Sequence, residues 1–315
     1  MAIPLDPEIA SALMMAAEQA GDVVIPKRDD ALGLRATVDE TLSATYRMLP
    51  DAPDVTAIEY TVTAGDGYDI PLRWYSRAGA NSGAAVVYVH GGGMISGTLD
   101  NYDGLVRHYV QLSGVPFLAV GYRLAPEYSG TIPASDSFAG IRWMFDNAAD
   151  NGVDATRIAL MGDSGGGGVG AGAAILARDN GVPLARQILI FPMLDDRNTE
   201  PDPLLAPTAT WTYDNNYTGW HALLKEELGQ PNVSPVAAPA RLTDFAGLAP
   251  AFIEVGELDI FRDESIRYAT SLMQAGVSCE LHVHPGSPHA HDWLNPEAAI
   301  SKRAVAERLR VLAAL

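Results

Sequence analysis

The sequence is poor in the residues on which several classes of protein depend. Its single cysteine, Cys279, excludes an intrachain disulfide and a cysteine-based metal site. Only three of its 21 basic residues are lysines, so no polybasic segment can form. No run of 18 uncharged apolar residues occurs, and the N-terminal stretch lacks the basic region of a secretory signal. We therefore expect a cytoplasmic protein without a transmembrane helix.

Positive charge is also scarce relative to negative charge. The chain has 39 acidic residues and a formal net charge of -18. An acidic surface repels phosphate backbones and anionic lipid headgroups. Nucleic acid and membranes are therefore not expected partners.

What the chain does contain is a regular alternation of apolar runs and helix-length segments. Its 315 residues, 48% of them hydrophobic, can bury a large core, in one large domain or two smaller ones. Two strand-like stretches at 57–64 and 70–76 flank the turn sequence GDGY, which predicts a hairpin. Further strands are predicted at 84–90, 116–122, 157–162, 185–192, 250–256 and 278–284. Helices are predicted at about 101–113, 134–149, 166–179, 262–275 and 296–314, the last one capped by Asn295 with Pro296 at its first position.

This pattern predicts a three-layer α/β sandwich around a mostly parallel central sheet. Two regions do not fit the repeat. The N-terminal part carries predicted helices at 7–20 and 36–48, and residues 195–240 form a long insertion rich in proline, aspartate and aromatic residues. Because long irregular insertions in compact domains are usually functional, we expect Trp211 and Tyr217 of the insertion and the N-terminal helices to wall a pocket.

One serine lies in an unusual glycine-rich setting. The sequence Gly162-Asp163-Ser164-Gly165-Gly166 joins a predicted strand to a predicted helix and matches G-x-S-x-G, the nucleophile elbow. Such a turn lifts the serine hydroxyl above the end of the sheet. Glycine-rich turns of this type also bind phosphates, but no Walker lysine follows this one. Ser164 is therefore the candidate nucleophile.

A second glycine cluster follows an earlier strand. His90-Gly91-Gly92-Gly93 matches the HGGG pattern that supplies backbone N–H donors to an oxyanion. We expect donors from Gly91 and Gly92, with a third from Gly165, and an anchoring role for His90. The two motifs together are far more specific than either one alone.

The order of these motifs resembles the hormone-sensitive-lipase-like family, the bacterial family IV esterases. The resemblance covers about 84–295 and rests on HGGGMISGTLDNY, GYRLAPEY, GDSGGG, VSPVAA, GELD and PGSPHAHD. It implies an α/β-hydrolase fold of about eight strands with a helical cap, and carboxylesterase activity on short acyl chains. It also implies a Ser-Asp-His triad, no cofactor and no metal. We accordingly expect a cap region at 1–50 and a catalytic domain at 51–315 that contains the insertion.

The resemblance also indicates the acid and the base. Asp259 lies at the family's position after strand 250–256, and His289 lies at the position of the family's histidine. His291 stands where the family has an aromatic residue and is an alternative base. Asp195 and Asp196 are alternative acids, whereas Glu257 and Asp263 are expected to stabilise the loop and to cap a helix. Structural roles are expected for His282 and His284, and His221 lies in the insertion, before the acid candidates that follow strand 250–256.

The sequence thus predicts a serine esterase that acts on small-molecule esters, as a monomer or homodimer. Two alternatives remain open at this stage. One is an amidase, a deacetylase or an acyltransferase with the same triad, and the other is a non-catalytic binding protein.

Overall fold

The protein is built on one eight-stranded sheet, seen in a computed structural model that describes residues 3–19, 26–80 and 82–315. The strand order is β1-β2-β4-β3-β5-β6-β7-β8. β1 and β2 form an antiparallel hairpin, β2 pairs antiparallel with β4, and all remaining pairs are parallel. The strands are β1 (Val55–Thr63), β2 (Asp69–Arg77), β3 (Ala85–Val89), β4 (Phe117–Val120), β5 (Ile158–Asp163), β6 (Arg186–Ile190), β7 (Ala251–Gly256) and β8 (Cys279–His284).

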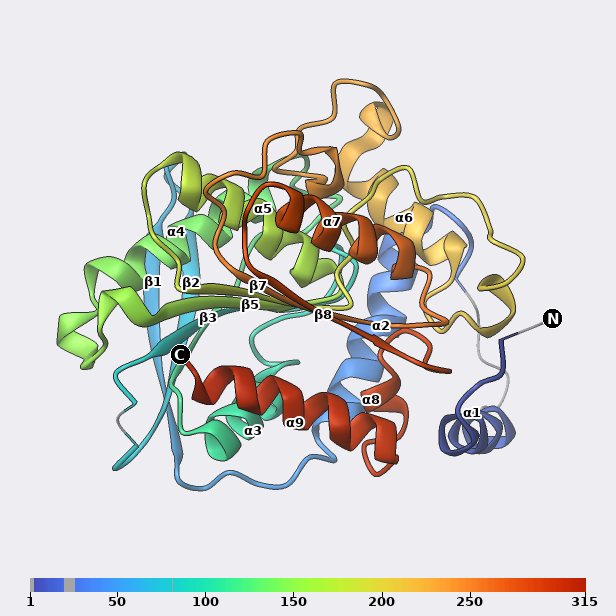
Figure 1. Cartoon of the computed structure of the whole chain (residues 1–315), viewed down its shortest axis with the longest axis horizontal. Coiled ribbons are helices and arrows are strands. Elements are labelled where there is room, and N and C mark those ends of the chain that lie inside the picture. The colour runs from blue at the N-terminus through green and yellow to red at the C-terminus, as the bar shows by residue number, and fades with distance from the viewer. Residues whose placement is uncertain (1–2, 20–25, 81) are drawn as a thin grey trace.

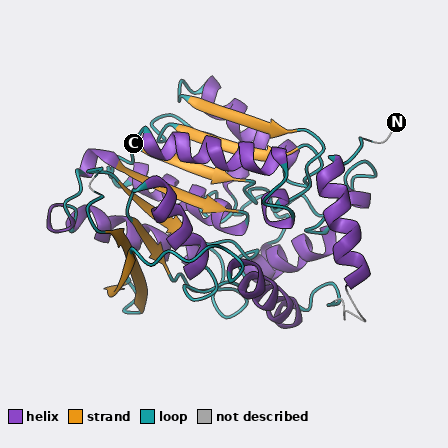
Figure 2. Ribbon diagram, turned by 90° about the horizontal axis from the view of Figure 1, so that it is seen from below, coloured by secondary structure: helices purple, strands orange, loops and turns teal. Residues whose placement is uncertain are grey.

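Helices cover both faces of this sheet and make three layers. Figure 1 shows α4, α5 and α7 above the sheet and α3 and α9 below it. β3, β4, β5 and β7 are buried at every residue, which explains their continuous apolar runs. Figure 2 shows how the strand direction rotates from one edge of the sheet to the other. The covering helices are α3 (Asp103–Ser113), α4 (Ile132–Asp146), α5 (Gly165–Asp179), α7 (Arg262–Gln274) and α9 (Ala299–Ala313).

The predicted α/β-hydrolase fold is therefore confirmed, but two helix boundaries differ from the expectation. The last helix starts at Ala299, after a turn that includes Pro296, so this proline is not its first residue. The second N-terminal helix starts at Ala31, because the Asp30 carboxylate caps it by accepting from the Gly33 N–H at 2.9 Å.

Four further helices lie near the ends of the parallel strands. α1 (Pro7–Gln19) packs against the single turn α8 (His291–Leu294), and α2 (Ala31–Tyr46) packs against α6 (Tyr213–Leu224) of the insertion. The final predicted residue of the first helix, Ala20, lies outside the described residues. Short 3-10 turns occur at Ala149–Asn151, Ala155–Arg157, Ala206–Thr208, Lys225–Glu227 and Pro239–Arg241. No helix within the described ranges is long and apolar enough to cross a membrane.

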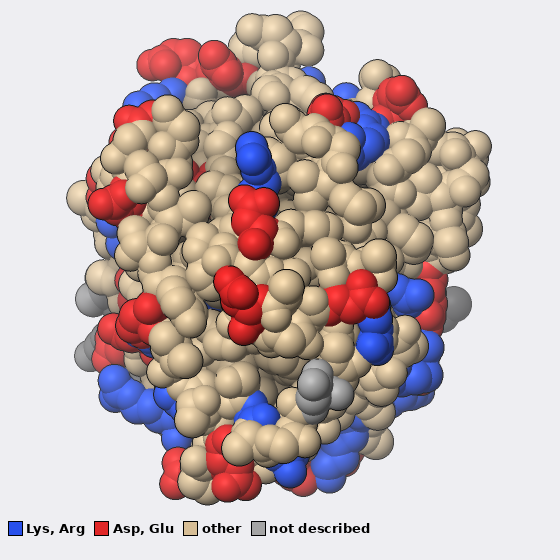
Figure 3. Space-filling model, turned by 90° about the vertical axis from the view of Figure 1, so that its left-hand side faces the viewer, with Lys and Arg blue, Asp and Glu red and all other residues tan. Residues whose placement is uncertain are grey.

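The surface distributes its charge in small groups. On the face in Figure 3, acidic and basic side chains lie close together and are separated by uncharged residues. Arginines often pair with carboxylates, as Arg73 does with Asp100 at 2.7 Å. The net negative charge is therefore partly offset by local ion pairs.

Candidate active site

The backbone at Ser164 has the conformation of a sharp strand-to-helix turn. Ser164 follows β5 directly, precedes α5 and has a φ of 54°, which is uncommon for a residue with a side chain. Its N–H donates to the Ile190 carbonyl at 2.8 Å, and its own carbonyl accepts from the Met193 N–H at 3.0 Å. The strained turn is therefore held by the neighbouring strand.

The glycines around the serine allow very close backbone contacts. A methyl group on Gly162 would lie 2.4 Å from the Gly166 carbonyl oxygen, and one on Gly168 would lie 2.0 Å from that of Met193. A methyl on Gly166 would lie 2.2 Å from the His90 carbonyl oxygen. The start of α5 thus packs directly on the backbone of two loops, which accounts for its poor helix-forming sequence.

The structure brings Ser164, His289 and Asp259 together in one hydrogen-bonded line. The Ser164 Oγ lies 2.9 Å from the His289 Nε2, and the His289 Nδ1 lies 2.7 Å from the Asp259 Oδ2. Asp259 is fully buried, and its second oxygen accepts from the Phe261 N–H at 2.9 Å. This orientation presents one ring nitrogen to the hydroxyl and leaves the other with the carboxylate, as acyl transfer by a serine requires.

Three residues that the motifs did not reveal hold His289, two at its ring and one at its backbone. Phe191 and Phe261 contact the ring edge-on, with centroid distances of 4.7 and 5.1 Å. The Thr210 hydroxyl donates to the His289 carbonyl at 2.7 Å. Phe191 and Phe261 follow β6 and β7. This position after a strand was the one signal in the sequence that could have indicated their role near the site.

The alternative acids and bases have other partners. Asp195 accepts two hydrogen bonds from the Arg197 guanidinium, and Asp196 accepts two from the Arg241 guanidinium. His291 is buried, its ring lies 5.3 Å from that of His284, and burial lowers its pKa. Among the described residues its ring nitrogens have no hydrogen-bond partner.

The remaining loop residues also differ in role. The Glu257 carboxylate accepts from the Gly286 N–H at 2.9 Å and so stabilises the loop, as expected. Asp263 instead pairs with Arg262 at 2.7 Å and does not cap α7.

The HGGG loop passes directly over the elbow. A methyl group on Gly165 would lie 2.7 Å from the backbone nitrogens of Gly93 and Met94. Within the described part of the chain, the N–H groups of Gly91, Gly92, Gly93 and Gly165 donate to no protein acceptor. Gly93, which was not among the predicted donors, therefore joins the candidates.

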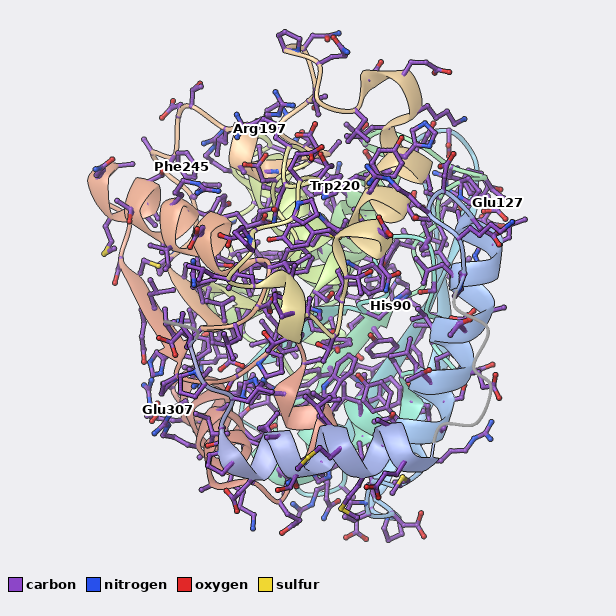
Figure 4. All side chains as sticks on the ribbon, turned by 90° about the vertical axis from the view of Figure 1, so that its right-hand side faces the viewer. His90, Glu127, Arg197, Trp220, Phe245 and Glu307 are labelled. Atoms are coloured by element: carbon purple, nitrogen blue, oxygen red, sulfur yellow. The ribbon has the colours of Figure 1, made fainter. Side chains whose placement is uncertain are left out.

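Buried polar residues support this loop from below. His90 stacks on Tyr122 at 4.3 Å, and burial lowers its pKa to about 4, so it is neutral at pH 7. His90 is buried and is labelled near the centre of the view in Figure 4. Asp163 accepts from Tyr88 at 2.5 Å and from Tyr102 at 3.2 Å, and burial raises its pKa to about 6.

Arg35 of α2 connects the N-terminal part to the loop that contains Ile95 and to the loop that contains Ala125 and Glu127. Its guanidinium donates to the Ile95 carbonyl at 2.5 Å, the Ala125 carbonyl at 2.7 Å and the Glu127 carboxylate at 2.6 Å. Glu127 is labelled beside α2 in Figure 4. α2 is therefore fastened to the segment that follows the HGGG motif.

Ser164 and His289 open into a cavity of about 440 Å3. One wall is formed by α2, and the opposite wall by the insertion and α8. The lining is mostly apolar and, within the described residues, contains no aspartate, glutamate, lysine or arginine. Besides Ser164 and His289 it comprises Pro26, Leu34, Thr37, Val38, Thr41, Leu42, Thr45, Gly92, Thr210, Trp211, Thr212, Asn215, Ala290, Trp293 and Leu294.

The aromatic residues of the insertion lie in different places. Trp211 lines the cavity, as expected, whereas Tyr217 is not among the lining residues and stacks on His221. The Arg28 guanidinium covers the Tyr217 ring at 3.9 Å. Tyr217 therefore contributes to the contact between the N-terminal segment and α6.

Only one group of side chains among the described residues has a spacing that suits a metal ion. It consists of Glu280, His282 and Glu307 and is only partly buried. Arg310 already pairs with Glu280 there. This group contains none of the residues around Ser164.

The central sheet and the serine elbow define an α/β hydrolase. The profile of a family described as alpha/beta hydrolase fold matches residues 86–292. Together with the relatives described next, this match shows that the chain belongs to the hormone-sensitive-lipase-like family of carboxylic ester hydrolases, as the motifs predicted.

Similar proteins span nearly the whole chain. Ethyl acetate hydrolase from Pseudomonas putida is 33% identical over 304 residues, which cover 90% of this chain and 91% of that protein. Carboxylesterase NlhH from Mycobacterium tuberculosis is 35% identical over 267 residues, with 80% and 82% covered. The structure of a bacterial heroin esterase superposes with a TM-score of 0.88 at 36% identity and covers 98% of this chain and 97% of its own.

Proposed function

We propose that the protein hydrolyses short- to medium-chain carboxylic esters through an acyl-enzyme formed on Ser164. The observation that carries this proposal is the hydrogen-bonded line from Asp259 through His289 to Ser164. A similar protein named ethyl acetate hydrolase supports the choice of small esters. No cofactor or metal is needed for this chemistry.

In the first half of the reaction, the His289 Nε2 takes the proton from the Ser164 Oγ as this oxygen attacks the ester carbonyl carbon. His289 then gives the proton to the departing alcohol oxygen, and the acyl group stays on Ser164. Asp259 accepts the other ring N–H, which keeps Nε2 free for the proton and stabilises the imidazolium.

In the second half, His289 takes a proton from water, whose oxygen attacks the acyl carbon. The bond to Ser164 then breaks, Ser164 regains its proton, and the carboxylic acid leaves. In both halves the negative oxygen of the tetrahedral intermediate accepts from the N–H groups of Gly91, Gly92 and Gly165, with Gly93 close by. Such preorganised donors contribute about 2.7–4 kcal/mol each.

The proposed cap consists of the two segments whose residues line the cavity above Ser164 and His289. Residues 1–50 and the insertion at about 195–240 form the cap over the catalytic domain at 51–315. The described parts of both segments supply cavity walls, α2 on one side and Trp211 on the other. The apolar lining favours the hydrocarbon parts of an ester over charged substrates.

The test measures hydrolysis of p-nitrophenyl acetate, butyrate, octanoate and palmitate by the wild type and Ser164→Ala. We expect activity on the shorter chains that vanishes in Ser164→Ala. Mass spectrometry after rapid quenching should find the acetyl group on the peptide that contains Ser164. Ser137→Ala is a matched control, because Ser137 is a buried serine that donates to the Pro133 carbonyl.

Two results would contradict the proposal. Activity retained by Ser164→Ala would remove Ser164 as the nucleophile. Activity on anilides that exceeds activity on esters would instead favour an amidase with the same residues.

A further inference from the structure

A buried arginine lies behind the catalytic residues. Arg308 of α9 is 2% exposed, and its guanidinium contacts three other elements. It donates to the Glu254 carboxylate of β7 at 2.7 Å, to the Asp292 carboxylate of α8 at 2.6 Å and to the Tyr109 hydroxyl of α3 at 3.1 Å. A fully buried charge is stable only with such partners, so these four elements are coupled at one point.

The charges in this cluster are strongly coupled. Burial raises the pKa of Glu254, but the attraction to Arg308 and His284 together outweighs this effect and lowers the pKa to about 2. The His284 Nε2 lies 3.5 Å from the second Glu254 oxygen. The carboxylate therefore stays ionised and bound to Arg308 at every pH at which an esterase is assayed.

The Glu254 and Asp292 carboxylates each lie within a few residues, along the chain, of a member of the triad. Asp292 is three residues from His289, and Glu254 lies in the strand that ends just before the Asp259 loop. The Glu254 carbonyl also accepts from the Phe191 N–H at 2.7 Å. Phe191 has a φ of 35°, and its ring centroid lies 5.8 Å from the Arg308 guanidinium carbon and 4.7 Å from the His289 imidazole centroid.

The segment that carries His289 has little support of its own. Ala290 adopts a left-handed conformation with a φ of 55°, and α8 is one turn of four residues. A helix this short is not stable in isolation. The position of α8 must therefore come from tertiary contacts. One of these contacts is the buried ion pair between Asp292 and Arg308. Figure 1 shows α8 and α9 adjoining below the sheet.

We propose that Arg308 is a positioning residue for the esterase reaction: through Asp292 and Glu254 it holds the His289 loop against β7 and so aligns His289 between Asp259 and Ser164. This inference rests on the proposed roles of those three residues. Arg308 touches no substrate and acts through its carboxylate partners.

Two conservative variants test this role. Arg308→Lys keeps the positive charge but lacks the planar fork that serves two carboxylates at once. Asp292→Asn keeps the shape of the side chain and removes its charge. We expect kcat for p-nitrophenyl acetate to fall on the order of 10- to 100-fold in each variant with KM within about twofold, because small misplacements of a catalytic group act on the chemical step.

The control is Arg241→Lys. Arg241 is also mostly buried and donates two hydrogen bonds of 2.7 Å to the fully buried Asp196. Its loss should lower the melting temperature about as much as Arg308→Lys does and leave kcat unchanged. All assays are run well below the melting temperature of each variant, as determined by circular dichroism.

A second readout does not depend on turnover. In the wild type, proton NMR should show a far-downfield resonance from the His289 N–H that is hydrogen-bonded to Asp259. We expect this resonance to shift or broaden in Asp292→Asn and to stay in place in Arg241→Lys.

The outcomes separate this inference from the proposed function. If the wild type is active, Ser164→Ala is inactive, and Asp292→Asn and Arg308→Lys retain both kcat and the downfield resonance, the role of Arg308 is refuted and the triad stands. If Ser164→Ala retains activity, the proposed function itself fails. A folded Arg308→Lys whose kcat falls no more than that of Arg241→Lys would also overturn the inference.

Discussion

Gly165 and Gly93 lie so close together that a methyl group on Gly165 would be 2.7 Å from the Gly93 backbone nitrogen. Real side chains do not approach a backbone atom so closely, and this backbone cannot move without displacing the HGGG loop. The first residue of the elbow helix and the loop that we propose to supply the other N–H donors therefore form one packed unit.

Gly165→Ala should accordingly push the loop away from Ser164. The proposed donors would then reach the oxyanion less well, so we expect kcat to fall by about 10- to 100-fold with a smaller change in KM. Steady-state kinetics with p-nitrophenyl acetate measure both constants.

Gly170→Ala is the matched control in the same helix. A methyl group there would make ordinary contacts of 3.6 Å with Leu160. Alanine is also the better helix former, so this variant should gain about 0.5–1 kcal/mol in unfolding free energy at unchanged kcat. Equal activity of Gly165→Ala and Gly170→Ala would count against an oxyanion role for this loop.

Asp259→Asn tests the acid. The asparagine side chain can present an N–H to the His289 Nδ1 and so favour the wrong ring tautomer. We expect kcat to fall about 10³- to 10⁴-fold with KM within about twofold. Glu257→Gln, in the same loop, should stay within about twofold of the wild type. Substantial activity in Asp259→Asn would reopen the choice of the acid.

His291→Phe tests the alternative base. Because neither ring nitrogen of His291 has a hydrogen-bond partner among the described residues, a phenyl ring should leave hydrolysis within about threefold of the wild type. His289→Phe should abolish hydrolysis. The reverse pattern would make His291 the base.

His291→Phe should also change how the stability of the protein depends on pH. Burial lowers the pKa of His291 below its usual 6.5 in the folded state, so the unfolded chain binds this proton more readily. The wild type therefore loses stability as the pH falls below about 6.5, and His291→Phe does not lose this part. The melting temperature of His291→Phe relative to the wild type should thus be higher at pH 5 than at pH 8.

Asp163→Asn should show a pH dependence in the opposite direction. Burial raises the pKa of Asp163 from 3.8 to about 6, so the folded state holds this proton more tightly than the unfolded state. Its contribution to stability is present below about pH 4, is lost as the pH rises through about 6, and stays absent above that value. Relative to the wild type, Asp163→Asn should gain on the order of 1–3 kcal/mol between pH 4 and 7.

Urea unfolding at the two pH values measures this difference. Asp150→Asn, at an exposed position, should show the same offset from the wild type at both. An offset for Asp163→Asn that does not depend on pH would mean that Asp163 titrates normally.

Trp211→Ala and Tyr217→Ala distinguish a residue of the cavity wall from a residue in the contact between the N-terminal segment and α6. Trp211 lines the cavity, so its truncation should change the ratio of kcat/KM for octanoate and acetate at least about fivefold. Tyr217 is not in the lining, so its truncation should leave this ratio unchanged. An identical ratio in both variants would show that Trp211 does not determine chain-length preference.

Much of the fold could be read from the chain because its signals are local. Strands covered on both faces leave continuous apolar runs, and the predicted strands agree with β3 to β8 to within a few residues. The predicted starts of two helices were wrong, because a local capping contact or turn decides where each helix begins. The Asp30 cap starts α2 early, and the turn at Asn295 delays α9 beyond Pro296.

The sequence by itself determined the hydrolase class and the candidate nucleophile, since the elbow and HGGG motifs are short segments whose geometry depends on their own glycines. Only the tertiary structure decided which acid and which histidine face Ser164, because Asp259 and His289 are about a hundred residues beyond it and five histidines follow the serine. The same holds for Phe191 and Arg308. Their places depend on how β6, β7 and α9 pack, and no local pattern in the chain encodes a contact between distant elements.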